Sequence, residues 1–350
     1  MKVGIDISAM NSMSKDRGIG FYTDYLIKSL KQYTDVEVVV LDGNQPSALS
    51  HQLDVIHYPF FDFFQPTLKV NPSIPTVVTI HDVIPLVFPK HYPSGIKGKI
   101  NLFRQRQALK KVKAIITDSE SSTRDVKKVF SIKQDKVFSV YLDCADDFKK
   151  ITKKSSIDQT LIKYRLPSKY VLYTGSVNWN KNLLNQTKAA LAQGIDIVYI
   201  GKGFESRENL NHPEMKSFKE FLDKYSKNSR VHILGYVSHQ ELIDLLSGAK
   251  AVLYVSYYEG FGLPILEAQS CGTPVITGNT SSMVEVAGKG ALLVDPDNEK
   301  SIEEAIDKIV SRSEVADEIK EKGYKNLDRF SWKKTAEETV KVYSYALSQK

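Results

Sequence analysis

Short apolar runs alternate with stretches of helical periodicity along the whole chain, and this alternation most constrains the fold. Alternation of this kind predicts parallel sheets flanked by helices. Six runs fall in each half of the 350 residues, so we expect an α/β fold with two sheets of similar size in two domains, joined by the lysine-rich Lys149–Ser156. The expected strands are Val3–Ile7, Val36–Leu41, Val55–His57, Thr76–Ile80, Ala114–Thr117, Val137–Val140, Tyr170–Thr174, Ile195–Ile200, Val231–Leu234, Ala251–Val255, Pro274–Thr277 and Ala291–Val294.

The segment Glu259–Glu267 sets two carboxylates eight positions apart around a glycine turn and an expected helix start. Its two glycines allow backbone N–H groups to approach a ligand, and Pro264 suits the first position of a helix that stops at Gly272. A helix N-terminus favours phosphate, and a first-turn carboxylate such as Glu267 can accept hydrogen bonds from ribose hydroxyls. The segment therefore predicts a site for a nucleoside diphosphate that bears a sugar. The alternative, a solvated loop acid at Glu259 and a helix-stabilising acid at Glu267, explains each residue only singly.

The same segment resembles the two-glutamate signature of the retaining family-4 glycosyltransferases, which have the GT-B fold. The resemblance covers nearly the whole chain, because further motifs follow in the family's order: Arg17–Thr23, Thr79–Pro85, Tyr170–Ser176, Lys181–Leu183, Leu234–Ser238 and Cys271–Val275. It implies two Rossmann-like domains whose parallel sheets face each other across a cleft. It also implies that residues 1–160 bind the acceptor, that residues 161–330 bind the nucleotide-sugar donor, and that residues 331–350 form a helix crossing back to the N-terminal domain.

Candidate site residues directly follow the expected strands, because open parallel sheets bind ligands outside the carboxyl ends of their strands. The resemblance implies catalytic roles for His81 beside the donor sugar, Lys181 at the pyrophosphate and Glu259 at the sugar. It implies donor-binding roles for Gly18, Gly20, Asp82, Gly201, Tyr236, Val237, Gly260, Phe261, Gly262, Leu263 and Glu267.

Within this set, the turn at Gly201 would pass near the nucleotide, and Tyr236 and Val237 would supply backbone contacts to the base. Gly18 and Gly20 would offer backbone donors to the phosphates, although a simple turn explains these two glycines as well.

The two residues that follow Ile80, His81 and Asp82, also have two open explanations. Asp82 would orient His81 or the following loop, or it would only form a turn before Pro85. In the second case His81 is a hydrogen-bonded histidine at a strand end.

One departure from the family's pattern concerns the positive charge at the pyrophosphate. Relatives with a similar loop place arginine just before the lysine or just after the glycine, whereas this chain has Asn180 and Ser176. Cleavage leaves negative charge on the departing diphosphate, which fixed cations and helix dipoles stabilise. Either Lys181 and the following helix suffice, or Arg17 or Lys15 supplies the second cation.

Three further motifs have structural explanations. Asp295–Asp297 resembles a metal-binding acid pair but follows the last strand and is expected to form a turn, so we predict an enzyme without metal or cofactor. Ser282–Glu285 has the spacing of a capping box and predicts that Glu285 caps a helix. The aromatic loop Tyr58–Phe64 fits a sugar- or lipid-contacting surface and a core-filling segment equally.

Charge is distributed unevenly between the two halves. Residues 1–165 hold 25 Lys+Arg against 17 Asp+Glu, a net +8, and the remainder holds 23 against 24, a net −1, which together give +7. The stretch Lys97–Lys113 carries seven basic residues and no acid, interleaved with apolar residues. We expect either a basic amphipathic helix on an anionic membrane surface or a surface helix with a solvated basic face and a core-facing apolar stripe.

The resulting prediction is a retaining, metal-independent glycosyltransferase. It would move a hexose or deoxyhexose, of mannose, glucose or rhamnose type, from a nucleoside-diphosphate sugar to a glycan or lipid-linked glycan. With two cysteines and no signal-peptide or membrane-span pattern, we expect a cytoplasmic protein that can lie on the inner face of the membrane. The alternatives are a nucleotide-sugar epimerase of the same fold, which would alter its substrate without an acceptor, and a basic nucleic-acid-binding protein, which would bind salt-sensitively.

Overall fold

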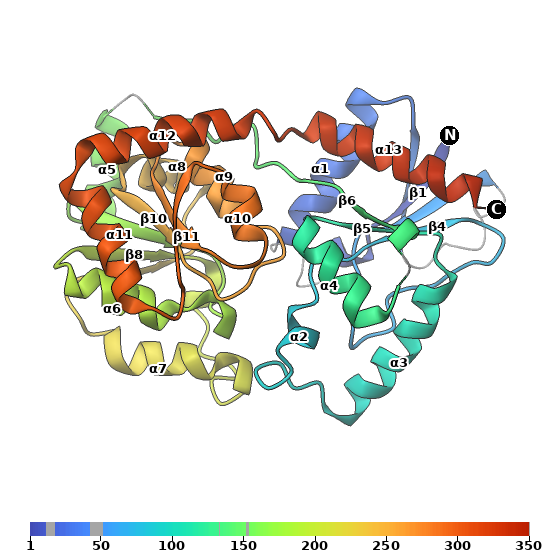
Figure 1. The fold of residues 1–350 in the computed structure, drawn as a ribbon, viewed down its shortest axis with the longest axis horizontal. Helices are drawn as coiled ribbons and strands as arrows, with labels where there is room; N and C mark the ends of the chain where they lie inside the picture. The colour runs from blue at the N-terminus through green and yellow to red at the C-terminus, as the bar shows by residue number, and fades with distance from the viewer. Residues whose placement is uncertain (12–17, 43–51, 133, 152–153, 350) are drawn as a thin grey trace. The chain divides into compact units, whose positions relative to one another are not determined.

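The computed structural model describes residues 1–11, 18–42, 52–132, 134–151 and 154–349. The chain forms two compact units (Figure 1). Unit 1 comprises Met1–Pro89, Pro93–Asp143 and Phe330–Lys350, and unit 2 comprises Lys90–Tyr92 and Cys144–Arg329. The division after Asp143 lies ahead of the expected linker Lys149–Ser156.

Each unit is built on a sheet that has six strands within the described ranges, and all neighbouring strands are parallel. The strand order is β2-β1-β3-β4-β5-β6 in unit 1 and β12-β11-β10-β7-β8-β9 in unit 2. The strands are β1 Lys2–Asp6, β2 Glu37–Leu41, β3 Val55–Tyr58, β4 Thr76–Thr79, β5 Ala114–Thr117, β6 Val137–Ser139, β7 Tyr170–Thr174, β8 Asp196–Ile200, β9 Val231–Gly235, β10 Ala251–Tyr254, β11 Val275–Gly278 and β12 Ala291–Val294. The predicted α/β fold is confirmed.

Central strands of both sheets are buried along their whole length, as β4, β5, β7 and β10 show. Helices cover parallel sheets on both faces, so their strands appear in sequence as continuous apolar runs rather than alternating ones. At the edge, β2 leaves Val40 exposed.

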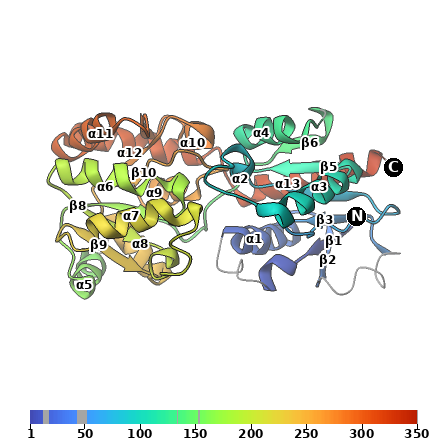
Figure 2. The same ribbon diagram turned by 90° about the horizontal axis from the view of Figure 1, so that it is seen from below.

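Helices of unit 1 include the last helix of the chain. They are α1 Gly18–Tyr33, α2 Ile84–Val87, α3 Gly95–Lys111, α4 Glu120–Phe130 and α13 Trp332–Ser348, with 3-10 turns η1 Ser8–Asn11 and η3 Gln134–Lys136. Helix α13 packs against α1 (Figure 1), where the Trp332 ring lies 5.1 Å from that of Tyr25. Helix α4 packs on β5 and β6 (Figure 2).

Helices of unit 2 connect and flank its strands. They are α5 Lys154–Tyr164, α6 Leu183–Ala192, α7 Lys216–Tyr225, α8 His239–Gly248, α9 Leu263–Ser270, α10 Ser281–Ala287, α11 Glu299–Ser311 and α12 Ser313–Leu327, with 3-10 turns η4 Trp179–Lys181, η5 Lys202–Phe204 and η6 Pro213–Met215. Among the helices of the described ranges, none has the length and apolar character that crossing a membrane requires.

The predicted capping box at Ser282–Glu285 is wrong. Helix α10 has Thr280 as its N-cap residue, so Ser282 lies inside the first turn. The Ser282 hydroxyl donates instead to the backbone carbonyls of Glu259 and Phe261. The predicted turn at Asp295–Asp297 is present, since the Asp297 N–H donates to Oδ1 of Asp295 at 3.0 Å.

The aromatic loop Tyr58–Phe64 contributes mainly to the core of unit 1. Tyr58 and Phe61 are buried, and the Tyr58 hydroxyl donates to the Lys69 carbonyl. The Phe63 ring stacks on that of Phe130. Of the two explanations, the structure favours core filling for these three rings.

Candidate functional site

A buried ion pair lies at the carboxyl end of the sheet in unit 2. Lys181 ends η4 after β7, and Glu259 follows the neighbouring strand β10. The Lys181 Nζ lies 2.7 Å from each carboxylate oxygen of Glu259, and the two side chains are only 13% and 7% exposed. The Lys181 ammonium also lies 5.6 Å from the centre of the Tyr254 ring. Two of the three predicted catalytic residues are therefore in direct contact.

The loop that carries Glu259 is held by the start of α10. The Glu259 N–H donates to Ser281 Oγ at 2.9 Å, while Ser282 Oγ donates to the carbonyls of Glu259 at 3.0 Å and Phe261 at 2.8 Å. Gly262 has a φ of 114°, a conformation that side-chain-bearing residues rarely adopt, and leads directly into α9. These contacts fix the direction in which the loop presents its backbone.

Glu267 is the fifth residue of α9, so it lies beyond the first turn in which the sequence placed it, and it is half-buried. Burial raises the pKa of its carboxyl group to about 7. Burial, and next the charge of Glu259, raise the pKa of Tyr254 well above its ordinary value, and Glu267 contributes to this rise. Tyr254 therefore keeps its proton, and the Lys181 ammonium lies beside its ring.

The ends of β7 and β8 approach each other too closely for side chains. A Cβ atom on Gly201 would lie 2.1 Å from the Gly175 carbonyl oxygen, and Gly201 has a φ of 149°. The Gly201 N–H donates to the Gly235 carbonyl. Glycine at position 201 is therefore required by the protein's own backbone, whatever it binds.

A backbone N–H group just after β9 already has a hydrogen-bond partner, Glu205, which the sequence analysis did not identify. The Tyr236 N–H donates to Oε1 of Glu205 at 2.8 Å, so a base could use this donor only by displacing Glu205. The Tyr236 side chain is 59% exposed, whereas Val237 is buried. Lys202 Nζ lies 5.2 Å from the centre of the Tyr236 ring.

Asn180 directly precedes Lys181, and its side-chain amide is buried. Its Nδ2 donates to the Tyr258 carbonyl at 2.8 Å, and its Oδ1 accepts from the Tyr92 hydroxyl at 2.7 Å. The neighbouring Trp179 ring stacks on His91 with centroids 3.6 Å apart. The Asn180 side chain therefore connects two other segments of unit 2, those of Tyr92 and Tyr258, by hydrogen bonds. The alternative cations, Lys15 and Arg17, lie outside the described residues.

In unit 1, His81 follows β4 and uses both of its ring nitrogens. Nδ1 lies 2.7 Å from Oδ2 of Asp118, and Nε2 lies 3.0 Å from the Pro59 carbonyl oxygen. Burial lowers the pKa of His81, but the charge and hydrogen bond of Asp118 outweigh this effect, so that the pKa is raised. Asp82 accepts the Ile84 N–H at 2.9 Å, the local turn expected before Pro85, which leads directly into α2.

Sequence reasoning missed Asp118, although a signal was present. Asp118 directly follows β5, the neighbour of β4, so its carboxylate belongs to the same sheet edge as His81.

Gly20 is buried, whereas Gly18 is exposed and a Cβ there would meet nothing within 4 Å. Both glycines lie at the start of helix α1, so the simple turn that the sequence allowed there is wrong.

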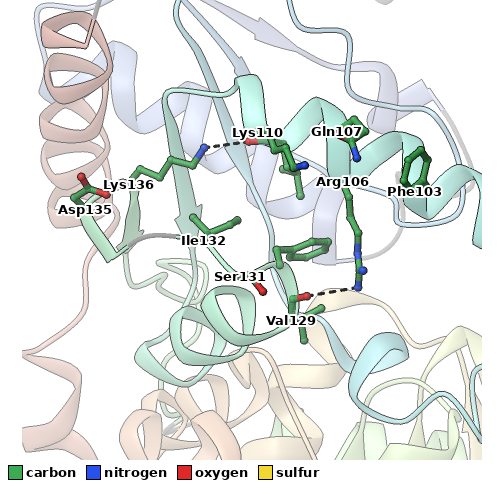
Figure 3. Close-up of a pocket in the computed structure, with 11 residues that line it drawn as sticks. Phe103, Arg106, Gln107, Lys110, Val129, Ser131, Ile132, Asp135 and Lys136 are labelled. Carbon is green, nitrogen blue, oxygen red and sulfur yellow. Dashed lines mark hydrogen bonds between the residues drawn. The ribbon is translucent and has the colours of Figure 1, made fainter.

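A cavity of about 570 Å³ opens between α3 and α4 in unit 1 (Figure 3). Arg106 and Lys110 line it together with Phe103 and Phe130. Lys136 lies at its edge, where its Nζ donates to the carbonyls of Leu109 and Val112 at the end of α3. None of the predicted site residues lines this cavity, so it is separate from the candidate site.

Two family models match the chain: Glycosyl transferases group 1 over residues 159–326 and Glycosyltransferase Family 4 over residues 46–142. The chain is 28% identical over 274 residues to the O-antigen chain mannosyltransferase B of Escherichia coli, covering 76% of this chain and 69% of that protein. It is 26% identical over 270 residues to the serotype-specific mannosyltransferase WbdA of Escherichia coli, covering 75% of this chain and 32% of that protein.

Solved structures match over nearly the full length. Sucrose-phosphate synthase from Thermosynechococcus elongatus has a TM-score of 0.76 at 16% identity, with 100% of both chains covered. Anabaena Alr3699/HepE in complex with UDP-glucose has a TM-score of 0.75 at 17% identity, with 97% of this chain and 99% of that chain covered. At these identities the likeness concerns the fold.

Proposed function

Because the chain belongs to the family-4 glycosyltransferases of GT-B fold, we propose that it transfers a hexose or deoxyhexose with retention of configuration. The donor is a nucleoside-diphosphate sugar, and the acceptor is a hydroxyl of a glycan or lipid-linked glycan. Mannose is the first sugar to test among the mannose, glucose and rhamnose types, since the O-antigen relatives carry mannosyltransferase names.

The observation that carries this proposal is the buried Lys181–Glu259 pair beside the N-terminus of α9. An ammonium group and a helix N-terminus stabilise a diphosphate leaving group, which gains charge as the sugar departs. In the occupied site Lys181 moves its hydrogen bonds from Glu259 to the pyrophosphate, and Glu259 then accepts from sugar hydroxyls. These charges serve the leaving group without a metal ion.

The remaining roles follow from the same arrangement. Glu267 accepts from the ribose hydroxyls, and the backbone of Gly260–Leu263 donates to the phosphates and sugar. For His81 the family resemblance supports a contact with the donor sugar. The leaving phosphate helps deprotonate the acceptor hydroxyl on the same face of the sugar, so no enzyme carboxylate forms a covalent intermediate.

Helix α3 supports a further part of the proposal, contact with an anionic membrane surface. Its buried positions include the polar Asn101 and Gln105, whereas Ile96, Ile100 and Phe103 are 82%, 50% and 63% exposed. The solvent face thus combines apolar side chains with the basic residues of Lys97–Lys113, and no ion pair is found for these cations among the described residues. Such a face suits insertion among acidic lipid headgroups.

Nucleotide sugars with different bases and sugars test the proposed activity. The true donor raises the melting temperature, since it binds only the native state, and is slowly hydrolysed without acceptor. NMR of the transferred sugar then reports whether the anomeric configuration is kept, and activity after treatment with a chelator reports on metal. A panel in which no nucleotide sugar stabilises the protein would contradict the proposal, and an altered sugar nucleotide without acceptor would indicate an epimerase.

A further inference from the structure

Hydrogen bonding around His81 determines which atoms of its ring carry protons. The Pro59 carbonyl oxygen near Nε2 is only an acceptor, and an ionised Asp118 carboxylate near Nδ1 is also only an acceptor. A neutral imidazole has one N–H and can satisfy one of these two oxygens. Both bonds form together only when the pair of His81 and Asp118 holds one proton more than a neutral ring beside a carboxylate.

Asp118 is built into the core at a cost. It is 3% exposed, and its second oxygen, Oδ1, has no hydrogen-bond partner among the described residues. A buried acceptor without a partner destabilises a folded protein, so an apolar residue would serve packing better. A carboxylate retained in such a place beside a histidine favours a functional role.

We propose that Asp118 is the positioning residue that keeps His81 doubly protonated, so that Nε2 remains an N–H donor at neutral pH. Asp118 fixes the ring through Nδ1, and in the protein without substrate Nε2–H donates to the Pro59 carbonyl. When substrate binds, an oxygen of the sugar replaces that carbonyl as the acceptor. This last step rests on the proposed glycosyl transfer, whereas the protonation of the pair does not.

Other groups around the ring are compatible with this assignment. Tyr22 of α1 meets the His81 ring edge-on at 4.8 Å, and its hydroxyl bonds with Thr79. Asp82 adds a further negative charge nearby. Burial, and next the charge of His81, lower the pKa of His57 on β3 to about 3, so His57 stays neutral.

Histidine NMR of the protein without ligand tests the proton directly, with His81 assigned by loss of its signal in His81→Gln. The His81 ring should titrate above its ordinary pKa of about 6.5 in the unmodified protein and at least about one pH unit lower in Asp118→Asn. Asp35→Asn, which removes an exposed carboxylate of unit 1, is the control and should leave the midpoint unchanged. A normal or low His81 midpoint in the unmodified protein overturns the proposal even if Asp118→Asn does not fold, and so does an unchanged midpoint in Asp118→Asn.

Kinetics test the consequence for transfer. In Asp118→Asn, kcat should fall most at neutral pH and recover toward the unmodified value as the pH is lowered and His81 regains its proton. A purely structural role for Asp118 would lower kcat equally at every pH and would overturn the positioning role. Titration as expected in a protein that turns over no nucleotide sugar would instead leave the protonated pair standing and contradict the proposed function.

Discussion

Lys181 and Glu259 form an ion pair in the structure. Removing the charge of Glu259 should therefore strengthen diphosphate binding and weaken sugar transfer. In Glu259→Gln the ammonium group no longer has to leave a carboxylate, so a free nucleoside diphosphate should bind about tenfold more tightly. Sugar transfer should nevertheless fall by about 100-fold or more, because the sugar loses its acceptor. Calorimetry with the diphosphate and initial rates with the nucleotide sugar measure the two effects. Weaker diphosphate binding in the variant would argue against the exchange of partners.

Removal of Lys181 should affect stability as well as activity. Lys181→Ala leaves the 7% exposed Glu259 carboxylate without its cation, which should lower the free energy of unfolding by about 3–5 kcal/mol. The matched control is Lys188→Ala, which breaks the pair of Lys188 and Glu299. Lys188 is 59% exposed, so its loss should cost much less than the loss of Lys181. Urea unfolding compares the two variants. Equal losses in the free energy of unfolding would show that the ion pair of Lys181 and Glu259 contributes no more to stability than an exposed pair.

Glu267 should make stability depend on pH in a defined window. Burial raises its pKa from 4.5 in the unfolded chain to about 7, so between these values the folded protein binds more protons than the unfolded chain. The free energy of unfolding attributable to Glu267 therefore decreases as the pH rises through this window. In Glu267→Gln that decrease should be smaller, while other groups that titrate there, including His81, are common to both proteins. Urea unfolding of both proteins at about pH 5 and pH 7.5 measures how much the free energy of unfolding decreases. The same decrease in both proteins would contradict the prediction.

Single site residues could be predicted from local spacing, whereas the hydrogen bonds that join them to distant residues could not. Glu259, Gly262 and Glu267 are revealed by local spacing alone. The partner of His81 is 37 positions away, and that of Tyr92 is 88 positions away, so neither pair leaves a local pattern. The error at Ser282 has the same origin, because a neighbouring loop offers its hydroxyl better acceptors than the helix end does.

At the scale of elements, the sequence predicted the strands of the described residues to within about one residue at each end. Central strands buried on both faces are uninterrupted apolar runs, and the less buried edge strands β2 and β12 are nearly as apolar in sequence. Helix α3 was harder to predict. Its apolar residues fit a core-facing stripe, yet Asn101 and Gln105 take buried positions because the carbonyls of Phe64 and Asp62 accept their amide hydrogens. Tertiary hydrogen bonds, absent from the pattern, decide which face of the helix is buried.

The exposed face of α3 gives a prediction for membrane binding. Replacing both Ile100 and Phe103 with serine should weaken binding to vesicles rich in phosphatidylglycerol, and Lys97→Gln with Lys99→Gln should weaken it by about tenfold or more. Ile162→Ser on α5, where Ile162 is 76% exposed, is the control and should have no effect. Vesicle sedimentation measures the binding. Equal binding to phosphatidylcholine vesicles, or no loss in either variant, would remove the membrane from the proposal.

At the scale of the whole molecule, the C-terminal helix should be essential for the stability of unit 1. The Tyr343 hydroxyl lies 2.8 Å from Nδ1 of the fully buried His57, so Tyr343→Phe should lower the free energy of unfolding by about 1–3 kcal/mol. Trp332→Ala should cost about 3–5 kcal/mol, because the indole is 4% exposed. Chemical denaturation followed by fluorescence measures both. Tyr345→Phe is the control, since Tyr345 is only half-buried. If this control lowered the free energy of unfolding as much as Tyr343→Phe does, the prediction would be contradicted.

The position of α13 also sets an order of assembly during synthesis. Translation delivers this helix after all of unit 2, although it packs on α1 and on the sheet that the first part of the chain builds. The ribosome thus starts unit 1 first and completes it last. Until residues 330–348 emerge from the exit tunnel, the apolar surface that Trp332 and Tyr343 later cover stays open to chaperones, while unit 2 can already close.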